Sequence, residues 1–500
     1  MERLTAFVWE HIGDDTTRLI MNKAKWPEID MDMAVSCIES RRKLRGKVQE
    51  WCDEPRLIFP RKLSAEQCSS SATGIYKAEL AERIYLTGTG LAPYNGGQNS
   101  DSKIGFRLAD LTGGLGVDSW FFSKKAGQVM YCEMLQELCM AAKHNYAVLQ
   151  ANNITVNNAA IISKTQIDQQ EKANQELSVP TKDQGMNTES LSVFKTPSQI
   201  LSDFQPNIVY IDPARRGEGG KKVFLIEDCT PDVLTLKDEI FQHTRHILLK
   251  LSPMADITMV CERLGRCCRE VHVVAAGGEC KELLVWMDRE WDDEYTIHAV
   301  ELHKDGEAGV FSFNVLEEKN AVALQYSSHV CNGTTNKSNN SSNNSCSENT
   351  KDEKLYLFEP GKALMKAGAF NLVAERFQIA KLGRSTHYYI FSALESKGTE
   401  ASKSESKPST DSITVFQAKT QELKRYGKVF RIIRMEPLDK RTIKAAGKEF
   451  PKSEVTARNI PMDTDTLRKK LGVTSGDDAH IFGLKSDCQG SLLIITQIKG

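Results

Sequence analysis

Long apolar segments are missing from this chain of 500 residues. No run approaches the roughly 18 consecutive apolar residues that a membrane-spanning helix requires, so no membrane association is expected. The N-terminus includes Glu2, Glu10, Asp14 and Asp15 and has no apolar core, which predicts that the chain carries no signal peptide. These absences favour a cytoplasmic location.

An excess of charge of one sign is also lacking, since 65 Lys and Arg residues face 66 Asp and Glu residues. A uniformly basic, nucleic-acid-binding chain is thereby excluded, and any basic surface must be local. The 13 cysteines are scattered and form no CxxC pair, and the tightest group, Cys261, Cys267 and Cys268, has no histidine at zinc-finger spacing. We therefore expect free thiols in a reducing compartment, with neither a disulfide framework nor a metal site.

Changes of pattern divide the chain into five parts. Residues 1–95 show apolar positions at helical spacing and are predicted to form an N-terminal helical region. Residues 96–291 alternate between strand and helix patterns, with a flexible polar insertion at about 164–203. The other parts are a small strand-rich piece at 292–330, a disordered low-complexity linker at 331–354, and a mixed α/β region at 355–500 with a polar linker at about 395–412.

The alternating part predicts an α/β fold with a mostly parallel sheet. Its helix candidates are 120–125 and 134–150. The last two strand candidates are separated only by residues 277–281, which indicates an antiparallel hairpin. The strand candidates are 104–108, 128–132, 154–156, 208–211, 246–251, 271–275 and 283–287.

A Gly-rich turn, DLTGGLGVD at 110–118, follows the first strand candidate. Such a turn lets a ligand approach the backbone closely, at the amides that begin the next helix. The carboxylate of Asp110 is suited to a cationic amino-acid group, and Glu133, at the end of the second strand, is suited to two ribose hydroxyls. Dinucleotide oxidoreductases and S-adenosylmethionine methyltransferases both use this arrangement, but the third glycine of the GxGxxG fingerprint is absent here.

A second candidate site ends the fourth strand, at IDPARRG. Pro213 rigidifies the turn and presents Asp212 beside a transferring group, which suits a nucleophile held in line with a methyl sulfonium. Arg215 and Arg216 are candidates for holding a phosphate or the substrate backbone.

Together these motifs resemble class I S-adenosylmethionine-dependent methyltransferases. More narrowly, the chain is similar to a bacterial family in which a Rossmann-like methyltransferase core is followed by a ferredoxin-like piece and a THUMP-like C-terminal domain. The supporting stretches are EQCSS (66–70), YKA (76–78), DLTGGLGVDSWFF (110–122), IDPARR (211–216), KLSPM (250–254), EPGKALMKAGAF (359–370), RNIP (458–461) and LRKKL (467–471). The resemblance implies a ferredoxin-like piece at 292–330 and a THUMP-like region at 355–500.

The resemblance also implies roles for single residues. Glu133 is expected to hold the ribose of S-adenosyl-L-methionine, and Asp212 and Pro213 to lie at the point of methyl transfer. Asp118 and Asn158 are further cofactor-binding candidates, although the acidic residue that often binds adenine is not evident after the third strand. The methionine end of the cofactor is expected to contact Asp110, Thr112, Gly113, Gly114 and Gly116.

The sequence departs in two places from the motifs of related methyltransferases, and these departures limit which methyl-transfer reaction it predicts. No aromatic residue follows Pro213 to stack a target base. Uridine C5-methyltransferases need a cysteine nucleophile after the fifth strand, where this chain has Ser252 and Pro253, while Cys280 lies one strand later and is read as structural. Direct transfer to a base nitrogen is therefore favoured.

A local basic surface is predicted near the C-terminus, because residues 419–470 hold 15 Lys and Arg against 7 Asp and Glu. Such a segment suits the binding of RNA, and THUMP domains generally bind RNA. The alternative interpretation is a solvated charged face with no partner. The trio at 387–389 (HYY) either contacts RNA or forms an ordinary half-buried strand. A methyltransferase for a small molecule or protein, a non-catalytic RNA-binding module and, more remotely, a nicotinamide oxidoreductase remain open, and nothing fixes the oligomeric state.

Overall fold

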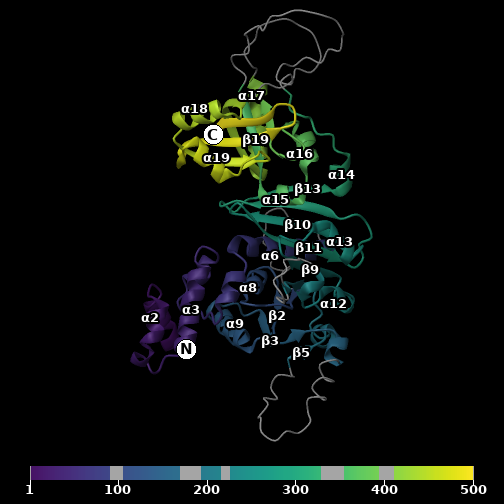
Figure 1. Ribbon diagram of the computed structural model, residues 1–500. Helices are drawn as coiled ribbons and strands as arrows, with labels where there is room; N and C mark the ends of the chain where they lie inside the picture. The colour runs from purple at the N-terminus through teal and green to yellow at the C-terminus, as the bar shows by residue number, and fades with distance from the viewer. Residues whose placement is uncertain are drawn as a thin grey trace, which may run out of the picture. The chain divides into compact units, whose positions relative to one another are not determined.

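The computed structural model of the chain describes residues 2–90, 105–168, 193–215, 226–327, 354–392 and 410–498 (Figure 1). These residues belong to two compact units. The first unit comprises Met1–Ala276 and Lys281–Tyr295, and the second comprises Gly277–Cys280 and Thr296–Gly500. No helix of the described ranges is long and apolar enough to cross a membrane. The linker predicted at 331–354 lies outside the described residues except for its last residue.

The first unit begins with helices, which are α1 (Glu2–Glu10), α2 (Thr16–Met21), α3 (Met31–Leu44), α4 (Gln49–Cys52), α5 (Lys62–Gln67) and α6 (Ser71–Thr89). Three of them, α2, α3 and α6, are capped at their N-termini by polar side chains. Asp15 accepts a hydrogen bond from the amide of Thr17 at 2.9 Å, and Ser70 forms a capping box with Thr73. The prediction of N-terminal helices is confirmed.

Seven strands of the first unit lie in the order β10-β11-β9-β6-β1-β2-β3. β1 pairs in parallel with β2 and with β6, β2 with β3, and β6 with β9, whereas β11 runs antiparallel to β9. Strand order therefore reverses between β1 and β6, and open α/β sheets bind ligands beyond the carboxyl ends of their strands at such a reversal. The strands are β1 (Arg107–Asp110), β2 (Gln128–Glu133), β3 (Ile154–Asn158), β6 (Ile208–Ile211), β9 (His246–Leu251), β10 (Cys268–Ala276) and β11 (Glu279–Asp288).

Helices connect these strands, and the first two are the ones that the sequence predicts. α8 (Val117–Ser123) joins β1 to β2, and α9 (Gln136–Val148) joins β2 to β3. The later connections contain α11 (Pro197–Leu201), α12 (Val233–Ile240) and α13 (Ile257–Leu264). Large side chains fill the interior, and Phe121, Tyr131, Tyr210 and Trp286 are all buried. The predicted α/β fold class is confirmed.

Several sequence-based boundaries are wrong. In the hairpin, β10 extends to Ala276 and β11 begins at Glu279, instead of ending at 275 and beginning at 283. β1 begins at Arg107 instead of residue 104 and extends to Asp110, and α8 starts at Val117 instead of residue 120, because Gly116 in a left-handed conformation ends the turn there. The polar insertion at 164–203 is structured at its C-terminal end, where β5 (Phe194–Lys195) pairs with β4 (Ala160–Ile161). α11 follows, since Thr196 forms a capping box and Pro197 opens the helix. Residues 169–192 of this insertion lie outside the described residues.

The second unit contains a seven-stranded sheet in the order β15-β16-β14-β17-β20-β19-β18. Its strands are β14 (Leu355–Pro360), β15 (Ala380–Lys381), β16 (Tyr389–Ser392), β17 (Gly427–Pro437), β18 (Lys452–Arg458), β19 (Thr474–Ser486) and β20 (Gly490–Thr496). β12 (Thr296–Leu302) and β13 (Ala308–Asn314) form an antiparallel hairpin. The helices are α14 (Val315–Asn320), α15 (Lys362–Ala367), α16 (Phe370–Phe377), α17 (Thr410–Tyr426), α18 (Lys440–Glu449) and α19 (Thr464–Leu471).

α17 corrects the end of the polar linker predicted at 395–412, because it is already helical at Thr410; residues 395–409 lie outside the described residues. The tyrosines of the trio at 387–389 are core residues. Tyr388 is buried and donates its hydroxyl to Glu359 at 2.7 Å, and Tyr389 is buried and donates to the carbonyl of Phe370 at 2.7 Å.

The contact between α6 and α8 yields a stability prediction. A Cβ on Gly74 of α6 would lie 2.2 Å from the buried ring of Phe121 in α8. We predict that Gly74→Ala lowers the free energy of unfolding by about 1–3 kcal/mol, because overpacking outweighs the better helix propensity of alanine. The midpoint of urea denaturation measures the change. Gly13→Ala is the matched control, because nothing lies within 4 Å of its added Cβ; equal midpoints for the two variants would contradict the prediction.

Candidate active site

The Gly-rich turn after β1 depends on its glycines. Gly114 and Gly116 have φ angles of +54° and +91°, which glycine adopts without steric cost. At Gly113 the constraint is space, since a Cβ would lie 2.1 Å from the ring of Tyr131. The amide of Gly113 donates to the carbonyl of Cys132 at 2.7 Å, which holds the turn against β2. The predicted turn is therefore a tight backbone surface at the end of β1.

Asp110, the last residue of β1, is buried directly beneath this turn. Its carboxylate accepts hydrogen bonds from the hydroxyl of Ser119 at 2.6 Å and from the amide of Thr112 at 3.0 Å. Burial raises the pKa of Asp110 to about 7, although both hydrogen bonds lower it. Asp110 therefore exchanges its proton near neutral pH and would ionise fully beside a cation.

Glu133 ends the neighbouring strand β2 and meets the same turn. Its Oε2 accepts a hydrogen bond from the amide of Gly114 at 2.9 Å, and its Oε1 accepts one from the amide of Leu135 at 2.9 Å. The side-chain amide of Asn158 donates to the carbonyls of Glu133 at 2.8 Å and Met134 at 3.0 Å. Three candidates, Gly114, Glu133 and Asn158, are thus brought together at one edge of the sheet.

Asp118, in the first turn of α8, belongs to a buried ionic cluster. Its Oδ2 accepts hydrogen bonds from Tyr210 at 2.8 Å and from Ser69 at 3.0 Å, and its Oδ1 lies 3.4 Å from Nζ of Lys77. Burial alone would raise the pKa of Asp118, but the ammonium groups of Lys77 and Lys250 and the two hydrogen bonds outweigh it and lower the pKa. Asp118 is therefore a buried, ionised carboxylate.

Lys77 on α6 is the centre of that cluster and has no solvent-exposed surface. Its Nζ lies 2.9 Å from each carboxylate oxygen of Glu282 in β11 and donates to Ser69 at 2.9 Å. Burial raises the pKa of Glu282 although the lysines lower it. These contacts join the N-terminal helices to the sheet through a single ammonium.

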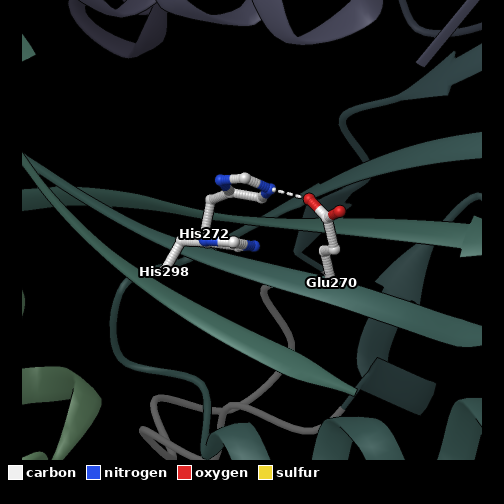
Figure 2. Close-up of side chains that lie close together, drawn as sticks. All are labelled: Glu270, His272 and His298. Carbon is white, nitrogen blue, oxygen red and sulfur yellow. Dashed lines mark hydrogen bonds and ion pairs between the residues drawn. The ribbon is translucent and has the colours of Figure 1, made fainter. Parts of the chain in front are cut away.

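A second polar cluster fixes α6 to β10. The hydroxyl of Tyr76 lies 2.8 Å from Nδ1 of His272, and Nε2 of His272 lies 3.0 Å from the carboxylate of Glu270 (Figure 2). Arg83 of α6 donates to the same carboxylate at 3.1 Å. Because α6 is held at both β10 and β11, the position of Lys77 is well defined.

Asp212 follows β6, on the opposite side of β1 from Glu133. Its amide donates to Oγ1 of Thr112 at 2.6 Å, which ties the second candidate turn to the first. Its Oδ2 lies 2.5 Å from Nζ of Lys250, which belongs to β9. The two turns predicted from sequence therefore meet at the reversal of strand order between β1 and β6.

The rest of the second turn is described only in part. Pro213 is buried, and β7 (Ala214–Arg215) pairs with β8 (Cys229–Thr230). The side chain of Arg215 and the whole of Arg216 lie outside the described residues, so their predicted roles stay predictions.

Sequence reasoning assigned no role to Lys77, Lys250 or Glu282. Lys77 and Lys250 stand inside motif stretches that support the resemblance, but a lysine in a helix or strand pattern predicts a solvated side chain. Glu282 stands in the hairpin strand with no motif around it. Only the pairing of β9 and β11 and the packing of α6 bring these three side chains to the turns.

The cluster carries an excess of negative charge. Lys77 and Lys250 face the carboxylates of Asp118, Glu282 and Asp212, and Asp110 and Glu133 lie at the adjoining turn. Beside them are the amides of a Gly-rich turn and the start of a helix. Such a site suits a cationic ligand that also carries hydroxyl groups.

Comparisons with known proteins bear on the domains and the fold of the chain. Residues 356–397 match a ferredoxin-like domain, and residues 427–497 match a THUMP domain-like family. The ferredoxin-like match lies downstream of 292–330, the stretch that the sequence suggests for that piece, and the predicted domain boundaries stay predictions. No curated protein sequence matches the chain.

Among solved structures, the chain resembles the "putative methyltransferase from Porphyromonas gingivalis W83" with 25% identity and a TM-score of 0.68, over 100% of this chain and 98% of that chain. A human "methyltransferase 10 domain containing protein" matches with 13% identity and a TM-score of 0.29, over 53% of this chain and 97% of that one. The likeness to the Porphyromonas gingivalis protein shows that the described fold is a methyltransferase fold. The chain therefore shares its fold with a "putative methyltransferase" and carries ferredoxin-like and THUMP-like matches, as its motifs predicted.

The raised pKa of Asp110 predicts how the free energy of unfolding changes with pH. Its carboxyl group ionises at its ordinary pKa of 3.8 when unfolded but at about 7 when folded, so its contribution to stability is lost as pH rises through that window. We predict that Asp110→Asn, which mimics the protonated acid, becomes more stable relative to the wild type by up to about 1.4 kcal/mol per pH unit between pH 5 and 7. Urea denaturation of both proteins at pH 5, 6, 7 and 8 measures the difference, and a difference independent of pH would refute the assignment.

Proposed function

We propose that this protein is an S-adenosyl-L-methionine-dependent methyltransferase that transfers a methyl group directly to a base nitrogen of RNA. The observation that carries the proposal is the meeting of two turns at the strand reversal, joined by the hydrogen bond between Asp212 and Thr112. One turn has the features of a cofactor cradle, and the other places a carboxylate beside it.

The residues of the first turn fit the cofactor. Asp110, with a pKa of about 7, can lose its proton to pair with the amino-acid ammonium group. Each oxygen of Glu133 accepts one backbone hydrogen bond and retains a lone pair for a ribose hydroxyl. The negative excess of the cluster favours the positively charged sulfonium, which supplies an activated methyl group.

In the proposed reaction Asp212 accepts a hydrogen bond from the target amine and orients its lone pair. The target nitrogen forms the new bond to the methyl carbon, the carbon–sulfur bond breaks with its electron pair on sulfur, and the nitrogen then releases a proton to water. The main contribution of the protein is to position the target amine in line with the methyl group, because the leaving group is already activated.

The nearby thiol supports direct transfer over a cysteine-dependent mechanism. Cys68, in the loop before α6, directly precedes Ser69, whose hydroxyl donates to Asp118 of the cluster. Burial raises its pKa to about 11, and the thiol donates to the carbonyl of Ala65 at 3.3 Å. A thiol that stays protonated at neutral pH is a poor nucleophile.

RNA is proposed as the substrate because of the C-terminal region. α18 and α19 bury their apolar sides in one core, at Ile443, Ala446, Leu467 and Leu471, so their polar sides face solvent. The match of residues 427–497 to a THUMP-like domain supports RNA docking. The exposed cations of the two helices, which we call the basic face, are Lys440, Arg441, Lys444, Lys448, Lys469 and Lys470.

The catalytic proposal predicts methyl transfer that depends on Asp212. With radiolabelled S-adenosyl-L-methionine, we expect label to enter RNA that lacks its own modifications and not a protein extract. Asp212→Ala should lower the rate by at least about 100-fold because the target amine is no longer oriented. Its affinity for the cofactor, measured by calorimetry, should fall far less than the rate, because Asp110, Glu133 and the Gly-rich turn are unchanged.

Other outcomes of that assay assign other functions. Label in the protein extract alone would move the substrate to the alternative class, a protein or small molecule. Cofactor binding without label in any fraction, or RNA binding without cofactor binding, would reject the RNA methyltransferase in favour of a non-catalytic module. Full activity of Asp212→Ala would remove Asp212 from the mechanism.

The docking proposal predicts that neutralising the basic face weakens RNA binding. Lys444→Gln with Lys448→Gln should raise the Kd for RNA about tenfold at low salt, because two phosphate contacts are lost. The slope of log Kd against log salt concentration should fall by about 2. Filter binding over a salt series measures both quantities.

The matched control neutralises two exposed lysines of the first unit, Lys23→Gln with Lys25→Gln. This variant makes the same change of net charge and should leave the Kd and the salt slope unchanged. Equal effects of the two double variants would show that net charge, and not the basic face, governs binding.

A further inference from the structure

Lys250 is placed beside Asp212 by the register of the sheet. β6 and β9 are parallel neighbours, and Ile211 lies opposite Leu249. Asp212, the first residue after β6, and Lys250, the next residue of β9, therefore lie side by side, with Nζ 2.5 Å from Oδ2. Among the described residues, Asp212 is the one hydrogen-bond acceptor of Lys250.

Lys250 keeps its charge despite its burial. Its side chain is 12% exposed, and burial alone would lower its pKa. The carboxylates of Asp212, Asp118 and Glu282 outweigh that cost and raise the pKa above its usual range. Lys250 is therefore a fixed cation at any physiological pH, with no deprotonated form to act as a base or nucleophile.

The pairing of Lys250 differs from that of the other buried lysine. Lys77 is enclosed by Glu282, which is itself buried, so that pair joins two rigid elements. The partner of Lys250 is a carboxylate with 36% of its side chain exposed, at the end of β6 where the two turns meet. A purely structural pair has no need of a partly solvated carboxylate at a strand reversal, whereas a site that must aim one carboxylate at a ligand does.

We propose that Lys250 is a positioning residue for methyl transfer, which holds Oδ2 of Asp212 so that Oδ1 is aimed at the target amine. No described residue donates a hydrogen bond to Oδ1, and the amide of Asp212 is fixed independently by Thr112. The carboxylate thus has one oxygen anchored and one directed to substrate. This inference rests on the proposed methyltransferase function.

The test compares variants of Lys250, in the full-length protein, with a variant of Arg245, a cation just before the start of the same strand. Lys250→Met keeps the length of the side chain and removes its charge; we expect kcat for label transfer to RNA to fall about 100-fold, with a far smaller change in the Kd for S-adenosyl-L-methionine. Lys250→Gln, which can still donate a hydrogen bond to Asp212, should give an intermediate kcat. The matched control is Arg245→Met, since Arg245 precedes β9 and pairs at 2.7 Å with Asp288 of β11, and its kcat should equal that of the wild type.

A double variant separates positioning from general damage to the fold. In an Asp212→Asn background, Lys250→Met should change kcat less than twofold, because the charge that Lys250 holds is already gone. Wild-type kcat in a folded Lys250→Met or Lys250→Gln protein, or full additivity with Asp212→Asn, would overturn the role of Lys250 alone. Absence of transfer by the wild type itself would overturn the proposed function, and this inference with it.

Discussion

The buried ammonium of Lys77 is the interaction on which the rest of the site depends. It joins α6 to β11 through Glu282 and to the start of α8 through Asp118. Removing one partner from a buried ion pair costs about 3–5 kcal/mol, because the other charge is left unpaired in a medium of low dielectric. The Gly-rich turn lies between β1 and α8, so a displaced α8 would move the turn as well. The N-terminal helices are therefore part of the structure that positions the site.

The parallel sheet is a second constraint, because it sets how far apart Glu133 and Asp212 lie on the two sides of β1. Asp110 lies opposite Tyr131 in β2 and Tyr210 in β6, so Glu133 and Asp212 each stand two residues beyond a partner of Asp110. Parallel pairing places their carboxylates at one edge without any direct contact between them. The hydrogen bond from Asp212 to Thr112 then fixes the second turn against the first.

Most strands and both turns could be predicted from sequence, because alternating apolar runs and glycines at fixed positions are local signals. β6 and β9 have the predicted bounds for this reason. β5 and α11 could not be predicted from the sequence. A short strand and a capped turn of helix need only a few apolar residues, and these stand within a polar stretch. Lys77, Lys250 and Glu282 could not be predicted as partners, since they are 32 to 205 residues apart and meet only through tertiary packing. Lys77 and Glu282, for example, come together because α6 packs beside β11.

The net charge of this buried cluster also bears on release of the spent cofactor in the proposed reaction. Two ammonium groups face three carboxylates, so one negative charge is left to be balanced. A sulfonium balances that charge, whereas the thioether that remains after methyl transfer is neutral. In the proposed reaction the spent cofactor would therefore lose an attraction that the active one has, and its affinity would fall at the step where it must leave. Asp110 acts in the same direction, because with a pKa of about 7 it can take up a proton again when the ammonium group of the product departs. Under the proposed function, the negative excess would thus favour both entry of the reactive cofactor and exit of its product.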